Sequence, residues 1–201
     1  GQLEEEDFTR MCSEAINRLR LVFHQYLEGK KRKKLSLFFN EREMEAFDPY
    51  HSTHKAHQFV ELEPVKFENE TLVAEGHILP HFSKLPMEDQ EVLGGPEGMM
   101  KNQGFYVYRN GRLIINGTWF NIRKYGEFSQ LVRISLDIPN TLDTIWKITI
   151  DKSGAELPAK MKRQLQNLVE ATSQRSRSVH RKKGGRIGLP NEISLWERFN
   201  A

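Results

Sequence analysis

The stretch from Leu131 to Ala171 constrains the fold more than any other part of the chain. Apolar and polar residues alternate from Val132 to Ile138 and again from Trp146 to Ile150, which is the period of two of a half-buried strand. Turn-forming residues between these runs favour an antiparallel pair. Apolar residues then recur at helical spacing from Pro158 to Ala171, which predicts an amphipathic helix. The short loop between the second strand and this helix contains Lys152.

A second strong pattern lies near the start of the chain. Residues 4–28 carry apolar side chains at steps of three and four, with acidic residues first, lysines afterwards and Gly29 placed to end the helix. This pattern predicts one long helix with a buried apolar stripe. Cys12 lies on that stripe and is predicted to be a core thiol. Because it is the single cysteine, an internal disulfide is excluded, and a reducing, cytoplasmic compartment is favoured.

Shorter alternating runs predict further strands. Asn110-Gly111 between two such runs is a strong hairpin signal, because both residues tolerate positive φ. The glycine-containing stretch from Pro86 to Gln103 is predicted to be a long loop. The other predicted strands are Leu35–Phe39 turning at Asn40 into Met44–Phe47, and the pair Phe59–Val65 and Thr71–Leu79.

Residues 3–183 are predicted to form one domain and residues 184–201 a tail, because domains usually contain about 100 to 200 residues. No apolar run approaches the roughly 20 residues that cross a bilayer, so no membrane association is expected. The chain begins with Gly1 instead of methionine. We therefore expect it to be part of a longer protein.

Motifs of self-contained enzymes are absent, including HExxH, GxSxG and the Walker loop. A stand-alone enzyme would need a pocket that joins His77 and His81 to acids from distant segments. His51, His54 and His57 could hold zinc on a helix, but Pro49 and the polar composition favour solvated loop histidines. No metal site is predicted.

Basic residues are concentrated locally, although the net charge is only +3. Two clusters could contact nucleic-acid phosphates, or could simply be solvated faces. Lys152 also has two interpretations. It could be a cation that a rigid loop aims at an anion, or it could be an ordinary solvated loop lysine. The candidate nucleic-acid contacts are Lys30, Lys31, Arg32, Lys33, Arg175, Arg177, Arg181, Lys182 and Lys183.

Two long segments carry a resemblance to a known superfamily: QGFYVYRNGRLIINGTWF and LVRISLDIPNTLDTIWKITIDKSGAELPAKMKRQL. VFHQYLEGKKRKKLSLFFN and HILPHFSKL add to it. Together they resemble the region after the nucleotide-binding domain of bacterial GHKL-type ATPases, the group of gyrase, heat-shock-ninety chaperones, histidine kinases and MutL-type mismatch proteins. Microrchidia-like and chaperone-like ATP-binding proteins are the most similar. The resemblance extends from about Phe8 to Gly184.

This resemblance implies an α+β transducer domain, with a mostly antiparallel sheet and helices on one face, like the second domain of small-subunit ribosomal protein five. In such proteins a loop lysine contacts the γ-phosphate of ATP, and Lys152, with Ser153 beside it, matches that position. Ile150-Asp151 stands where gyrase-type proteins have glutamine-threonine.

The motifs that hold ATP and Mg²⁺ in this superfamily are missing from the chain. The resemblance therefore implies no cofactor in this chain, and ATP and Mg²⁺ in the parent protein. The expected partner is the chain's own upstream ATP-binding domain, with a homodimer and nucleic acid as further possibilities. The chain alone is not expected to hydrolyse ATP.

Overall fold

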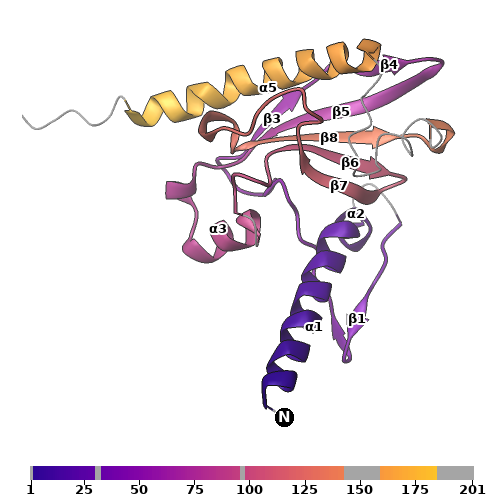
Figure 1. The fold of residues 1–201 in the computed structure, drawn as a ribbon, viewed down its shortest axis with the longest axis vertical. Coiled ribbons are helices and arrows are strands. Elements are labelled where there is room, and N and C mark those ends of the chain that lie inside the picture. Colours follow the sequence, from indigo (N-terminus) through magenta and orange to yellow (C-terminus); the bar gives the residue numbers. More distant parts are fainter. Residues whose placement is uncertain (1, 30–32, 96–97, 143–158, 185–201) are drawn as a thin grey trace, which may run out of the picture.

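The computed structural model describes residues 2–29, 33–95, 98–142 and 159–184, with side chains from 5 to 177 within these ranges. It is an α+β structure in which a mixed, mostly antiparallel sheet of six strands has a long C-terminal helix packed on it (Figure 1). The elements in chain order are α1 Gln2–Val22, α2 His24–Glu28, β1 Phe38–Phe39, β2 Arg42–Glu43, β3 Gln58–Glu61, β4 Val65–Phe67, β5 Glu70–Ile78, η1 Phe82–Lys84, α3 Met87–Gly94, β6 Gly104–Arg109, β7 Arg112–Thr118, η2 Glu127–Ser129, β8 Val132–Ile138, η3 Asn140–Leu142 and α5 Ala159–Gly184.

The main sheet has the strand order β3-β5-β8-β6-β7, and β4 also pairs with β5. β8 is antiparallel to β5 and parallel to β6. Both edges of β8 are therefore occupied, so it has no edge for the predicted antiparallel partner that follows it in the chain. That predicted strand, Trp146–Ile150, lies outside the described residues.

One face of the sheet forms the main core with α5. Val132, Ile134, Leu136 and Ile138 of β8 point to this face, and the predicted period of two is confirmed. The predicted C-terminal helix is also confirmed. Its side chains that pack on the sheet are Met161, Leu165, Leu168 and Val169.

The opposite face of β8 differs from the prediction for a half-buried strand. Arg133 is fully buried and Ser135 is 7% exposed. The Tyr106 ring and Met99 cover Arg133, so most of this face of the central strand is also shielded from water. Helices are consequently not confined to one face: α5 lies on one side, whereas α1 and α2 contact β7 from the other (Figure 1).

The predicted N-terminal helix is correct in type but wrong in its continuity and burial. It breaks at Phe23 between α1 and α2, and Gly29 ends α2 with φ 67° as predicted. Phe8 is 67% exposed and Met11 64% exposed, while Cys12 is half-buried. Figure 1 shows the reason, since most of α1 projects away from the sheet. None of the described helices is long and apolar enough to cross a membrane.

Turns form at the positions where asparagine and glycine residues predict them. Asn110 and Gly111 have φ of 50° and 80° and join β6 to β7 as predicted. Asn40 likewise turns β1 into β2, although these strands contain only two residues each. The predicted strand Met44–Phe47 is wrong, because β2 ends at Glu43 and this segment bonds to α1 instead, through Arg20 Nε and the Glu45 carbonyl. The predicted loop from Pro86 to Gln103 is wrong in part, because it contains α3. That helix buries only Leu93 and Gly94, so it has no apolar stripe for a periodicity search to find.

We expect Leu165→Ala to destabilise the protein by about 2 to 5 kcal/mol, because it opens a cavity between α5 and the sheet. Leu165 is fully buried, whereas its neighbour Gln166 is exposed. The matched control Gln166→Ala should change stability by no more than about 0.5 kcal/mol. Urea unfolding followed by circular dichroism measures both. Equal effects of the two substitutions would contradict the packing of α5 described above.

Candidate functional site

Lys152 and Ser153, the predicted phosphate contacts, lie outside the described residues. The structure does describe both flanks of their segment. Leu142 on one side is 2% exposed and Met161 on the other is fully buried, and both belong to the same core cluster. The chain on either side of residues 143–158 is therefore fixed in one hydrophobic core.

Hydrogen bonds place these two flanks at the same end of the sheet. The Gln164 side chain accepts a bond from the Lys66 backbone N–H at 2.9 Å and donates one to the Lys66 carbonyl at 2.8 Å. These bonds join the start of α5 to β4. On the other flank, Thr141 Oγ1 donates to the Glu70 carboxylate at 2.7 Å. Both flanks thus meet the turn between β4 and β5.

The predicted nucleic-acid contacts are only partly described. Lys30, Lys31 and Arg32 lie outside the described residues, and Lys33 is exposed after α2. Arg175 and Arg177 are exposed on α5, on the other side of the sheet. Arg181, Lys182 and Lys183 fall within α5, but their side chains are outside the description.

A further basic residue, Arg123, joins the α5 group. Its Nη1 donates to Ser173 Oγ at 2.7 Å. Burial lowers the pKa of Arg123, and the charge of Arg177 lowers it further. Because Ser173 and Arg177 lie four residues apart on α5, the bond to Ser173 brings Arg123 to the helix face that carries Arg177. Sequence reasoning missed Arg123 because it lies in an irregular segment far from α5 in the chain.

The sheet face opposite α5 carries a buried polar network that the sequence did not reveal. Its centre is Tyr108 of β6, whose hydroxyl lies 2.8 Å from His24 Nε2 and 2.7 Å from the Tyr50 hydroxyl. Tyr108 is 1% exposed, and His24 is 3% exposed. The network therefore connects α2 to a strand of the sheet through side chains that water does not reach.

Histidines extend the network toward the β3 edge. The His77 ring stacks on Tyr50 with centroids 4.0 Å apart and an interplanar angle of 17°. Its Nδ1 lies 3.1 Å from His57 Nε2. The 51–57 run forms turns, so its three histidines do not share a helix face, as predicted. His81 instead caps η1 through Ser83, so the pocket that would combine His77 with His81 is not formed by these contacts.

Arg133 of β8 is the buried cation of this face. Its Nη1 donates to the Gln130 and Val132 carbonyls at 3.0 and 3.2 Å, and its guanidinium lies 5.6 Å from the centre of the Tyr106 ring. A buried charge is expensive unless hydrogen bonds compensate it. Carbonyl dipoles and an aromatic face compensate it in part, but Nε is buried without a hydrogen-bond partner, and burial lowers the pKa of Arg133.

The protonation states indicate what this network can do. Burial raises the pKa of Tyr106, and it raises the pKa values of Tyr50 and Tyr108 well above the usual range of a phenol. These phenols therefore stay neutral and act as hydrogen-bonding groups, not as ionised bases or nucleophiles. Burial also lowers the pKa of His57, which favours its neutral ring.

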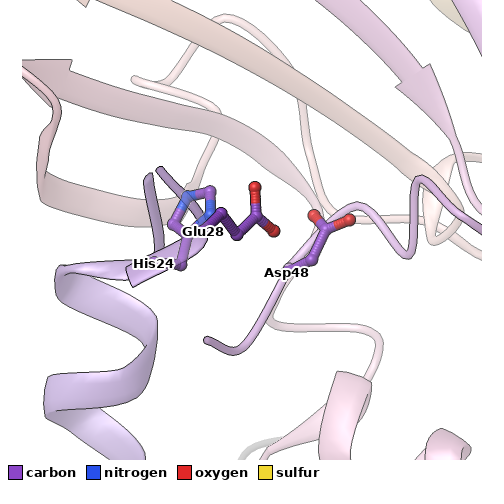
Figure 2. A group of neighbouring side chains, drawn as sticks. All are labelled: His24, Glu28 and Asp48. Carbon is purple, nitrogen blue, oxygen red and sulfur yellow. The ribbon is translucent and has the colours of Figure 1, made fainter. Parts of the chain in front are cut away.

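Next to the network, His24, Glu28 and Asp48 bring one nitrogen and two carboxylate ligand atoms within 4.8 Å of one another (Figure 2). A hollow of about 380 Å³ adjoins them, and Glu28, Asp48, His51 and Asp89 are among its lining residues. The spacing of His24 and Glu28 on α2 is a signal that sequence reasoning could have used. The third donor comes from a loop, and only the tertiary structure brings it near.

Hydrogen bonds fix the Asp48 carboxylate. It accepts the Tyr50 backbone N–H at 2.9 Å, the Ser52 backbone N–H at 2.7 Å and the Ser52 hydroxyl at 2.5 Å. Burial by itself raises the pKa of Asp48, but the bonds from Ser52 and Tyr50, with the nearby His24, outweigh burial and lower it. Asp48 is therefore a preorganised anion at neutral pH.

We expect Tyr108→Phe to destabilise the protein by about 1 to 3 kcal/mol, because it removes the partner of two buried polar groups. Tyr125→Phe is the control, since Tyr125 is 42% exposed and its hydroxyl donates to the Gly117 carbonyl. Water can replace that bond, so the control should lose at most about 1 kcal/mol. Urea unfolding at neutral pH distinguishes them, and a Tyr108→Phe protein as stable as the wild type would contradict the network.

Comparison with known protein families, with curated proteins and with solved structures found no match for this chain.

Proposed function

We propose that this chain is the transducer-type region of a cytoplasmic, bacterial GHKL-type ATP-binding protein. In this proposal it senses the γ-phosphate of ATP bound by an upstream domain and relays a conformational change. The observation that carries the proposal is the fixing of both flanks of the Lys152 segment, through Leu142 and Met161, in one core. A loop lysine that reports on a nucleotide must be presented by a rigid frame, and this arrangement supplies one.

The architecture supports the same proposal. A mixed sheet with one long helix on it is compatible with the transducer fold that resembles the second domain of small-subunit ribosomal protein five. In the sequence, Lys152 lies between the central strand β8 and α5, the helix on the main core face. A movement of the lysine toward a phosphate would therefore displace β8 and α5, which belong to the most buried part of the structure.

The N-terminal helices supply a route for the relay. α2 is joined to β6 by the buried bond between His24 and Tyr108, so displacement of the sheet is transmitted to α2. The exposed apolar side chains of α1, which include Phe8 and Met11, suit packing against another domain. We assign that contact to the upstream ATP-binding domain.

In this proposal, ATP shifts the equilibrium between an open and an ATP-engaged arrangement of the protein. A charge-assisted contact between Lys152 and the γ-phosphate would stabilise the ATP-engaged arrangement by about 1.5 to 3 kcal/mol. The contact is lost when the phosphate leaves, and the equilibrium returns toward the open arrangement.

The test is Lys152→Ala in the protein that includes the ATP-binding domain. We expect ATP hydrolysis to fall roughly 10-fold or more, because about 1.4 kcal/mol corresponds to tenfold in rate. Lys160→Ala is the control, since Lys160 is an exposed residue at the start of α5 and should leave the rate unchanged. Unchanged hydrolysis and unchanged ATP-dependent domain closure in Lys152→Ala would contradict the assignment of Lys152.

A nucleic-acid-binding role is the second candidate, favoured by the bond that brings Arg123 to the face of α5 that carries Arg177. Two neighbouring guanidinium groups attract phosphate without reading base sequence. It would add to the transducer role and would use the same α5.

We expect the purified chain to bind duplex or single-stranded DNA at about 50 mM salt and to bind more weakly at about 200 mM salt. The double variant Arg123→Ala/Arg177→Ala should weaken binding, whereas Arg163→Ala, at an exposed position of α5, should not. Fluorescence anisotropy with labelled DNA measures this. Absence of binding at the lower salt concentration would exclude the role.

A further inference from the structure

We propose that His24, Glu28 and Asp48 bind one divalent transition-metal ion of the zinc type. This inference is independent of the proposed function, because it concerns a different face of the sheet from the one packed on α5. It rests on the donor types, their geometry and the way in which neighbouring residues hold each donor.

The donors match the chemistry of such an ion. One imidazole nitrogen and two carboxylate oxygens are a ligand set that zinc accepts, and zinc lies near the top of the affinity order of the first-row divalent ions. The three ligand atoms lie within 4.8 Å of one another. Bonds of about 2.0 to 2.2 Å place ligand atoms roughly 3 to 4 Å apart, so a small rotation of the Glu28 side chain closes the set. Figure 2 shows the three side chains converging.

The position of His24 and Glu28 on α2 accounts for part of this geometry. Residues four apart on a helix lie on the same face. α2 contains only five residues, and it ends at Gly29 immediately after Glu28. The two donors therefore project together from the last turn of the N-terminal helices toward the loop that carries Asp48.

A hydrogen-bond partner for one ring nitrogen of His24 is already in place. Its Nε2 lies 2.8 Å from the Tyr108 hydroxyl, and the pair is buried. Metal-bound imidazoles commonly use their second nitrogen in this way, which fixes the ring orientation. The geometry assigns Nδ1 to the ion.

Asp48 is held just as firmly on the other side. Its carboxylate accepts bonds from the Tyr50 backbone N–H and from the backbone N–H and hydroxyl of Ser52. A carboxylate that is oriented before binding loses little entropy when an ion arrives. Carboxylate oxygens have more than one lone pair, so these bonds leave Asp48 able to coordinate as well.

The adjoining hollow completes the site. Its volume is about 380 Å³, which is large enough for water ligands at the open positions of the ion. Asp89 of α3 also lines it and lies 3.7 Å from His51 through Oδ2 and Nε2. The hollow thus contains three carboxylates from three separate segments, and a divalent cation would offset their mutual repulsion.

Metal binding would add a further link between elements that hydrogen bonds and aromatic packing already connect. The ion would tie α2 to the Asp48 loop, and Tyr108 would connect it to β6. The N-terminal helices would be locked to the sheet when the ion is present. Because ions that bind the folded state shift the unfolding equilibrium, metal should raise thermal stability.

The test uses tag-free chain, depleted of metal with a chelator and then titrated with zinc chloride in an isothermal calorimeter. We expect one zinc ion per chain and an increase in melting temperature on addition of zinc. Magnesium should bind at least tenfold more weakly, because it prefers an all-oxygen shell and retains its waters.

Glu28→Gln removes one donor at nearly constant volume and should weaken zinc binding at least tenfold. Glu91→Gln is the matched control, because Glu91 is an exposed carboxylate of α3 outside the triad. It should bind zinc like the wild type. Far-ultraviolet circular dichroism checks that both variants fold, and Asp48→Asn serves if Glu28→Gln does not.

Three results would overturn the proposal. The first is binding of less than half an equivalent of zinc by the wild type, and the second is equal affinity in Glu28→Gln and the wild type. The third is retention of zinc by Glu28→Gln with loss in His54→Ala. That result would place the ion on the histidine run of residues 51–57 instead.

Discussion

The structure depends on the burial of both faces of β8. Its apolar side chains pack against α5, and Arg133 and Ser135 are buried on its other face, where the Tyr106 ring covers Arg133. A strand buried on both faces shields its polar groups from water, so the polar residues on its second face need partners within the protein. Arg133 finds them in carbonyl oxygens and the Tyr106 ring, although its Nε is buried without a hydrogen bond.

That requirement explains why the second face is polar and aromatic instead of aliphatic. Tyrosine and histidine combine a large apolar area with a polar group, so they can exclude water from Arg133 and also hydrogen-bond to one another. Tyr108 illustrates both roles, because it is nearly fully buried and bridges His24 and Tyr50. The same side chain then fixes His24 beside two carboxylates. The network and the candidate metal site are therefore one continuous piece of structure.

The two faces of the sheet have different roles. The α5 face is a close-packed hydrophobic core that fixes both flanks of residues 143–158. The other face joins the N-terminal helices to the sheet through directional polar contacts and aromatic packing. In the proposed transducer, the first face would receive the nucleotide signal and the second would pass it on toward the upstream domain.

The sequence by itself determined the elements whose signals are local. The alternation in β8, the helical spacing of α5 and the turn at Asn110-Gly111 are set by backbone geometry and by nearby side chains, and all three were predicted. It could not determine which faces become buried. Phe8 and Met11 have the spacing of a core stripe yet are exposed, while Arg133 looked solvated and is buried. Burial depends on which segments meet in space. The helix α3 has no periodic apolar pattern because it buries too few residues, so the sequence did not predict it. The convergence of His24, Glu28 and Asp48 was likewise decided only by tertiary structure, because a helix and a loop about 20 residues apart come together there.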